Sequence, residues 1–217
     1  MRNGHQFQTK FAAENYDNAR NFWDVPVFES KDFAALPTVG ALVEGWLLIV
    51  PKAPAISFAK LSNSQFAELE VFLSDIVSVM ESVYGTVSVF EHGPSTQGSC
   101  IGCGVDYAHL HIVPVQCDLL AEARRIAPNI KWKEIPSLEA VSSCIESENG
   151  YWFLKQDFRS DACYIGTAVD GKPTSQLFRK VIAASIGCPS AYDWKQHLGE
   201  QNIIATVRKL NHNLQPA

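Results

Sequence analysis

The sequence predicts an α+β fold, and three features of the chain indicate it. Short apolar runs of strand type precede and follow one long amphipathic helix in the first half. In the stretch 106–115, Tyr107, His109 and His111 alternate with apolar residues. Such alternation is typical of a β-strand, whose successive side chains point to opposite faces. The second half mixes shorter helices and strands without a repeat. Strands and helices that do not alternate regularly are typical of α+β proteins.

Four strands are predicted in the first half. Two short ones at 27–29 and 33–36 are separated by a polar turn. The run 46–50, W-L-L-I-V, is continuously apolar and ends at a proline, which is typical of a strand buried on both faces. Another strand is predicted at 86–91, directly before a glycine-rich loop.

The main helix is predicted to follow a capping box. Ser62 is the expected N-cap, and Gln65 stands three residues later. Gly85 occupies a C-cap position. The apolar residues between these ends have helical spacing and are expected to face the core: Phe66, Leu69, Leu73, Ile76, Val77, Met80, Val83 and Tyr84.

The second half is predicted to contain four helices and two strands. The helices are expected at 118–127, 137–146, 175–186 and 202–210, and the strands at 151–154 and 162–168. We expect three parts in the chain: an N-terminal segment at 1–26, a domain at 27–116, and a C-terminal extension at 117–217 packed on that domain.

Composition excludes several classes of function. The chain has 217 residues and a net charge of −5, so it has no basic surface suited to duplex nucleic acid. It contains no apolar run of membrane-spanning length and no apolar region near its N-terminus, so we expect neither a membrane partner nor a signal peptide. Six cysteines without dense, regular spacing suggest a reduced, cytoplasmic protein.

The stretch D-Y-A-H-L-H-I-V-P-V at 106–115 is the strongest functional signal. In a strand, Tyr107, His109 and His111 would share one face, and the opposite face would be apolar. Neutral histidine can act as a nucleophile, general base or metal ligand near pH 7. One histidine on a strand is usually structural, but two at this spacing favour a functional site.

The loop before this stretch is rich in glycine, with Gly93, Gly98, Gly102 and Gly104 close together. Such loops allow backbone N–H groups to approach an anion. Gln97 and Ser99 in the same loop could orient phosphate or water. An anion site beside two imidazoles suggests phosphoryl chemistry.

Zinc binding is the competing hypothesis. The H-x-H pair could supply two ligands, and Cys100, Cys103, His92 or Asp106 could supply others. The C-x-x-C at 100–103 lacks a second pair at the usual spacing. We therefore expect these cysteines to pack in the loop, and we predict no metal site.

Several motifs resemble the histidine triad (HIT) superfamily of nucleotide hydrolases and transferases. They are E-H-G at 91–93, G-C-G-V-D-Y-A-H-L-H-I-V-P at 102–114, and G-W-L-L-I-V-P-K at 45–52. The resemblance covers about residues 27–116. It is closest to bacterial members described as diadenosine polyphosphate hydrolase-like, which the segment 175–206 also resembles.

The resemblance implies a domain with an antiparallel sheet and a main helix, followed by a C-terminal α/β extension. It places the nucleophile at His109 and an assisting, phosphate-contacting histidine at His111. It implies nucleotidyl transfer through a histidine–nucleotidyl intermediate. Residues expected to bind phosphate are Gln97, Gly98, Ser99, Gly102 and Gly104, and those expected to bind the nucleotide are Leu36, Thr38 and Trp46.

Three positions depart from the family pattern. Tyr107 stands where the first histidine of the triad would be, Pro54 replaces a frequent histidine, and Thr38 replaces an acid or amide that often holds the ribose. Tyr107 and Pro54 suggest an alternative to an enzyme, a nucleotide-binding protein with little turnover. A zinc-binding domain that uses the H-x-H strand is a further alternative.

The resemblance also implies partners. The expected ligand is a small-molecule nucleotide, with no required cofactor, although a divalent cation can accompany a polyphosphate. A homodimer is expected, because HIT-like domains commonly pair through the main helix and a neighbouring strand. Arg179 and Lys180, on the predicted helix at 175–186, are expected to form a solvated face.

Overall fold

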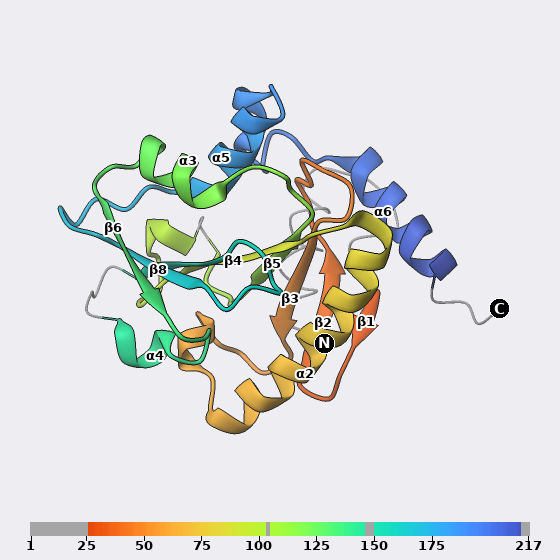
Figure 1. Ribbon diagram of the computed structural model, residues 1–217, viewed down its shortest axis with the longest axis horizontal. Helices are drawn as coiled ribbons and strands as arrows, with labels where there is room; N and C mark the ends of the chain where they lie inside the picture. Colours follow the sequence, from red (N-terminus) through yellow and green to blue (C-terminus); the bar gives the residue numbers. More distant parts are fainter. Residues whose placement is uncertain (1–25, 103–104, 146–149, 214–217) are drawn as a thin grey trace.

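An antiparallel sheet between two layers of helices forms the structure (Figure 1). A computed structural model describes residues 26–102, 105–145 and 150–213, so most of the predicted segment 1–26 lies outside the described residues. Within them, the sheet has eight strands in the order β1-β2-β3-β5-β4-β7-β8-β6, and every neighbouring pair is antiparallel. The predicted α+β class with an antiparallel sheet and a main helix is confirmed.

The strands are short, as expected for an antiparallel sheet of this size. Their bounds are β1 Phe28–Glu29, β2 Phe33–Pro37, β3 Leu47–Pro51, β4 Ser88–Gly93, β5 Leu110–Val113, β6 Ile130–Ile135, β7 Tyr151–Lys155 and β8 Cys163–Ala168. The helices are α2 Asn63–Tyr84, α3 Leu119–Ile126, α4 Val141–Cys144, α5 Leu177–Ser185 and α6 Glu200–Asn213, with 3-10 turns η2 Phe58–Lys60, η3 Cys100–Gly102 and η4 Pro189–Tyr192.

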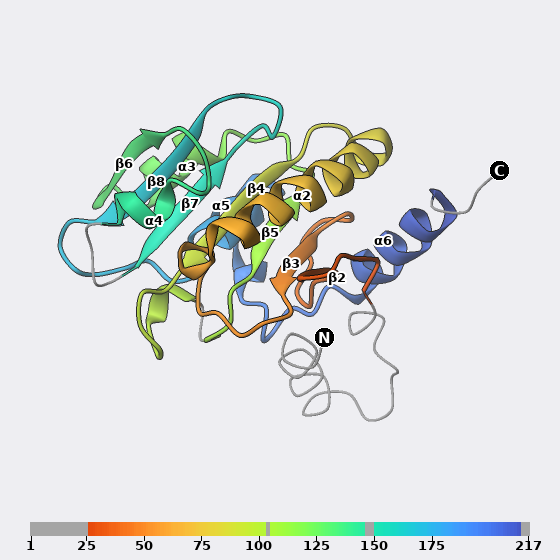
Figure 2. The ribbon, with the colours of Figure 1, turned by 90° about the horizontal axis from the view of Figure 1, so that it is seen from below.

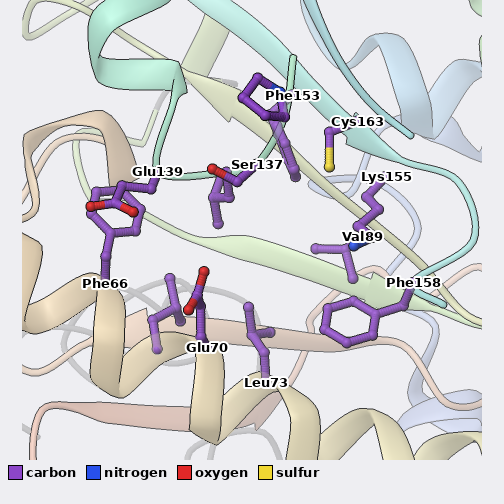
Figure 3. A pocket seen from close by; sticks show the side chains of 13 residues that line it. Phe66, Glu70, Leu73, Val89, Ser137, Glu139, Phe153, Lys155, Phe158 and Cys163 are labelled. Atoms are coloured by element: carbon purple, nitrogen blue, oxygen red, sulfur yellow. The ribbon is translucent and has the colours of Figure 1, made fainter. Parts of the chain in front are cut away.

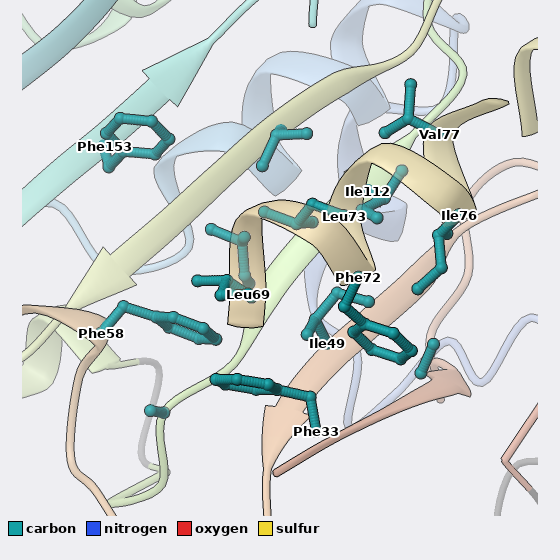
Figure 4. Close-up of a cluster of buried hydrophobic side chains, with 14 of the residues drawn as sticks. Phe33, Ile49, Phe58, Leu69, Phe72, Leu73, Ile76, Val77, Ile112 and Phe153 are labelled. Atoms are coloured by element: carbon teal, nitrogen blue, oxygen red, sulfur yellow. The ribbon is translucent and has the colours of Figure 1, made fainter. Parts of the chain in front are cut away.

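Helix α2 covers one face of the sheet (Figures 1 and 2). The predicted capping box is present, because the Ser62 side chain accepts from the Gln65 N–H while the Gln65 side chain accepts from the Ser62 N–H. Gly85 ends the helix with a φ of 80°, a conformation that favours glycine. The apolar stripe of α2 packs with side chains from β2, β3 and β5, including Phe33, Ile49 and Ile112 (Figure 4).

The opposite face is covered by α3 and α5. Since alternate residues of a strand face opposite sides, Phe90 of β4 lies on this face while its neighbour Val89 faces α2. Phe90 packs in this second core with Trp46, Trp152 and Phe178. The sheet is therefore buried on both sides at its centre.

The C-terminal half continues the sheet as well as packing on it. Strands β7, β8 and β6 extend the sheet beyond β4, so residues on both sides of the predicted boundary at 116 share one sheet. Strand β6, whose run I-K-W-K-E-I carries three charges, was not predicted from the sequence. Charged residues are common on edge strands because they discourage pairing with another chain.

Two predicted bounds are wrong. The strand proposed for 106–115 contains only Leu110–Val113, so Tyr107 and His109 precede it. The helix proposed for 137–146 contains only Val141–Cys144, and Gly150 precedes the next strand with a φ of 94°. Within the described residues, no helix is both long and apolar enough to cross a bilayer.

Candidate active site

Three histidines meet on the sheet face that α5 covers. His111 lies in β5 directly opposite Phe90 of β4, and His92 lies two residues further along β4. Partners in an antiparallel pair project to the same side, so the strand register itself brings these rings together. His109, just before β5, completes the group.

The rings lie close enough to act on one ligand. The His109 and His111 ring centroids are 5.1 Å apart, and those of His111 and His92 are 5.9 Å apart. Phe90 stacks on His111 at 4.5 Å and 19°. His92 and His111 are 1% and 5% exposed, whereas His109 is only partly buried, so His109 is the most accessible of the three.

The hydrogen bond of His109 defines its tautomer. Its Nδ1 lies 2.7 Å from the main-chain oxygen of Tyr107. A carbonyl oxygen only accepts, so Nδ1 must carry the proton and donate it. In the neutral ring, Nε2 then holds the lone pair. His109 therefore presents an unprotonated nitrogen, as a nucleophile requires.

His111 has the opposite arrangement. The indole Nε1–H of Trp46 donates to Nδ1 of His111 over 2.9 Å. Because indole is only a donor, Nδ1 of His111 is the acceptor and Nε2 carries the proton. The neighbouring rings thus offer one lone pair and one N–H, which suits attack on a phosphorus atom and stabilisation of its oxygens.

His92 is anchored by the C-terminal half. Its Nε2 accepts a 3.4 Å hydrogen bond from the backbone N–H of Phe178, at the start of α5. Burial, followed by the charges of His109 and Arg179, lowers the pKa of His92 to about 3. From the sequence, His92 was predicted only as a possible zinc ligand, although it lies in the E-H-G motif at 91–93.

Burial also sets the charge of the other two rings. It lowers the pKa of His109, against a smaller opposing effect of the Tyr107 carbonyl. It lowers the pKa of His111 well below the usual range, helped by His109, His92 and Arg179. All three histidines are therefore neutral at pH 7, the form that can attack phosphorus or donate a neutral N–H.

Tyr107 supports the site from outside the strand. Its hydroxyl donates to the main-chain oxygen of Pro51 over 2.5 Å, and its ring packs on an apolar patch. That patch contains Leu36 and Leu48, and Leu48 pairs with His111, so it lies on the histidine face of the sheet. The hydrogen bond and the packing therefore fix the Tyr107 side chain beside the histidines. The Tyr107 carbonyl orients the His109 ring.

The other residues predicted for the nucleotide are buried. Leu36 and Trp46 are inaccessible to solvent, and the Thr38 hydroxyl donates to the Val39 carbonyl over 3.0 Å. Trp46 contacts the site through His111. Direct nucleotide contacts by these residues stay predictions.

Some polar groups of the glycine-rich loop already form hydrogen bonds within the protein. The backbone N–H of Gly98 donates to the Asp106 carboxylate over 2.8 Å, and Ser99 accepts from the N–H of Ile101. Gln97 is exposed, Gly102 ends η3, and Gly104 lies outside the described residues. Phosphate binding by this loop stays a prediction, and an anion would have to compete with Asp106 for the Gly98 amide.

Arg179 is buried, so the predicted solvated face at this position is wrong. The side chain of Arg179 is only 3% exposed. Its Nε donates to the Tyr192 carbonyl over 2.7 Å, and its Nη2 donates to the Gly40 carbonyl over 2.5 Å. Arg179 does not belong to the apolar pattern of 175–186, so its burial could not be predicted from that pattern. The side chain is buried because η4 and the loop at Gly40 pack against α5.

The predicted absence of a metal site stays a prediction. In the part of the chain that the structure describes, no three His, Cys, Asp or Glu side chains are arranged to hold a metal ion. Cys103, one of the suggested ligands, lies outside the described residues.

A cavity of about 340 Å³ lies on the opposite, α2 side of the sheet (Figure 3). Apolar side chains such as Phe66 and Phe153 line it, together with Glu70, Glu139 and Lys155. Its cysteine, Cys163, is buried, and burial raises the pKa of its thiol. A protonated thiol is a poor nucleophile, so the histidine group is the better candidate for chemistry.

No family model matches the sequence, and no curated protein matches it. Seventeen chains of solved structures match parts of this chain, among them the following two. One is a Hit-like protein involved in cell-cycle regulation from Bartonella henselae, crystallised with an unknown ligand; it is 16% identical, with a TM-score of 0.38 over 52% of this chain and 80% of that chain. The other is a hypothetical histidine triad nucleotide-binding protein from Sulfolobus tokodaii; it is 18% identical, with a TM-score of 0.37 over 49% of this chain and 68% of that chain. Similarity at this level identifies no function.

Proposed function

We propose that the protein is a HIT-type nucleotide hydrolase or nucleotidyl transferase that acts on a nucleoside polyphosphate through His109. One observation carries this proposal: the neighbouring rings of His109 and His111 present a lone pair and an N–H, respectively. That pairing matches the needs of attack on a phosphate ester or anhydride.

The chemistry has two steps. Nε2 of His109 attacks the α-phosphorus, a P–N bond forms, and the P–O bond to the leaving phosphate or nucleotide breaks. The Nε2–H of His111 donates to a phosphate oxygen as charge develops there. Water or another acceptor then attacks phosphorus, the P–N bond breaks and its electron pair returns to Nε2 of His109, and the proton of the acceptor is released to solvent.

The neutral state of the rings supports this assignment. A protonated His109 would have no lone pair, and the lowered pKa of His109 keeps the lone pair available at pH 7.

Mutation of His109 tests the proposal. His109→Ala should lower turnover of diadenosine tetraphosphate by at least about 10³-fold, as expected for loss of a covalent nucleophile. Intact-protein mass spectrometry after an alkaline quench should find a nucleotidyl adduct on the wild type and none on the variant. His197→Ala, at an exposed histidine, is the matched control and should behave as wild type. Near-normal turnover by a folded His109→Ala protein would refute the nucleophile.

A nucleotide-binding protein with little turnover is the second candidate. The bond between the Gly98 amide and Asp106 favours it, because that amide is then not free for a transferring phosphate. Calorimetric binding of a nucleotide to wild-type protein, with no turnover and no adduct, would establish this candidate in place of the enzyme.

A further inference from the structure

The loop at 38–45, between β2 and β3, is held by the C-terminal part of the chain. The Gly40 N–H donates to the Leu198 carbonyl over 2.6 Å. The Ala41 carbonyl accepts from Asn202 over 2.9 Å, and the Gly45 N–H donates to the Thr206 hydroxyl over 2.7 Å. Asn202 and Thr206 lie on α6, which Figure 1 shows beside the β1–β2 end of the sheet.

Arg179 of α5 makes the most extensive of these contacts. Its guanidinium joins Gly40 to Tyr192 through two hydrogen bonds, and its central carbon lies 5.0 Å from the ring of Trp46. An arginine over an indole face is an attractive arrangement, and burial strengthens it. Space at Gly40 is tight, because a Cβ there would lie 2.5 Å from the Trp194 Cβ and 2.9 Å from Nη2 of Arg179.

Trp46 connects the 38–45 loop to the histidines. It follows the 38–45 loop directly, and its indole N–H determines which nitrogen of His111 carries the proton. The ring also packs edge-on against His111 and Phe90, at 5.7 Å and 6.0 Å between centroids. A shift of the indole would remove the donor and leave His111 free to take the other tautomer.

We propose that Arg179 is a positioning residue for the candidate active site: by clamping the 38–45 loop and the Trp46 indole, it keeps His111 in the tautomer whose Nε2 carries the proton. The C-terminal extension then completes the site, although none of its side chains need touch the substrate. The consequence for turnover rests on the proposed nucleotidyl transfer, but the effect on Trp46 and His111 does not.

Arginine suits this role better than lysine. Its planar guanidinium donates in two directions at once, to Tyr192 and to Gly40, while its face stacks on Trp46. A lysine would keep the charge and the apolar stem, but its single ammonium could not reproduce both bonds and the stacking. Arg179→Lys therefore separates the geometry of the side chain from its charge.

The test is an NMR comparison of wild type, Arg179→Ala, Arg179→Lys and Lys180→Ala. ¹⁵N spectra report the Trp46 indole N–H and the tautomer of His111, and Trp46→Phe identifies the indole signal. In Arg179→Ala we expect the indole hydrogen to exchange at least about 10-fold faster and His111 to populate both tautomers. With a nucleotide substrate, kcat should fall by about 10- to 100-fold, as for a misplaced catalytic group, while KM changes much less.

Lys180→Ala removes a neighbouring charge on the same helix and should leave both signals unchanged, since the Lys180 ammonium lies over the Tyr192 ring, 5.1 Å from its centroid. Wild-type indole exchange and a single His111 tautomer in Arg179→Ala would overturn the proposal. If that variant does not fold, Arg179→Lys decides: altered signals support the clamp, and wild-type signals overturn it. Absence of turnover in the wild type would count against nucleotidyl transfer alone, because the spectra still decide the role of Arg179.

Discussion

A single indole hydrogen bond sets the tautomer of His111, so the role of Trp46 can be tested by mutation. Trp46→Phe keeps an aromatic ring but removes the donor to Nδ1 of His111. Loss of one buried hydrogen bond costs about 1 to 3 kcal/mol when a partner stays unsatisfied. We expect roughly a 10-fold lower kcat and a mixed His111 tautomer in ¹⁵N spectra.

Trp132→Phe is the matched control for that change. Among the described residues, the indole nitrogen of Trp132 has no hydrogen-bond partner, so the same substitution removes no bond there. Equal losses of kcat in the two variants would mean that ring volume, and not the hydrogen bond to His111, explains the effect.

The buried carboxyl of Glu91 should make stability depend on pH. Glu91 lies on the sheet face opposite His92, accepts from the Phe58 N–H over 2.8 Å and accepts from the Tyr151 hydroxyl. Burial raises its pKa from 4.5 to about 7, against the smaller lowering effects of these two hydrogen bonds. Between about pH 4.5 and 7 the folded state therefore binds more protons than the unfolded state, and this residue's contribution to the free energy of unfolding falls as pH rises.

Glu91→Gln should remove that dependence. The free energy of unfolding of the wild type, relative to the variant, should fall by on the order of 1 to 3 kcal/mol between pH 4.5 and 7.5, measured by urea denaturation. The buried histidines act in the opposite direction, since their lowered pKa values make stability rise toward pH 6.5, but both proteins share them. A difference that stays constant with pH would show that Glu91 does not titrate in this range.

Helix α2 owes part of its stability to its capping box. Ser62→Ala removes the side-chain acceptor of the Gln65 N–H and should lower the free energy of unfolding by about 1 kcal/mol, measured by chemical denaturation. Ser82→Ala, on the same helix, is the control, because Ser82 bonds only a carbonyl within its own turn. Similar losses in the two variants would argue against a specific contribution from the cap.

The elements predicted best are those whose signals are local. The limits of α2 follow from Ser62, Gln65 and Gly85, which act within one turn of the chain. Strand β6 was missed because its charged residues hide the apolar alternation, and its place at the sheet edge is a tertiary property. The strand at the histidines was predicted too long, because the alternation of side chains continues into residues 106–109, which precede the first paired residue, Leu110.

The assembly of the whole molecule remains a prediction. A homodimer through α2 would need an apolar contact on its outer side, and Val71 of α2 is 65% exposed. Light scattering at micromolar concentration should give twice the 24.0 kDa chain mass, and Val71→Asp should shift the protein toward the monomer. Val169→Asp, at a residue 57% exposed but outside α2, should leave the mass unchanged. A wild-type protein that is only a 24.0 kDa monomer would exclude the dimer.

The sequence by itself determined the α+β class, the main helix and the His109–His111 pair, because each depends on periodicity or spacing within a few residues. Only the tertiary structure decided the tautomers of these histidines and the membership of the site. Trp46 and His111 are 65 residues apart, His92 and Phe178 are 86 apart, and Arg179 and Gly40 are 139 apart. Such contacts depend on strand register and on packing of the C-terminal half, and burial then sets the charge state of the rings. No local sequence pattern predicts these contacts. Arg179, for example, would be exposed to solvent if no other element covered helix α5.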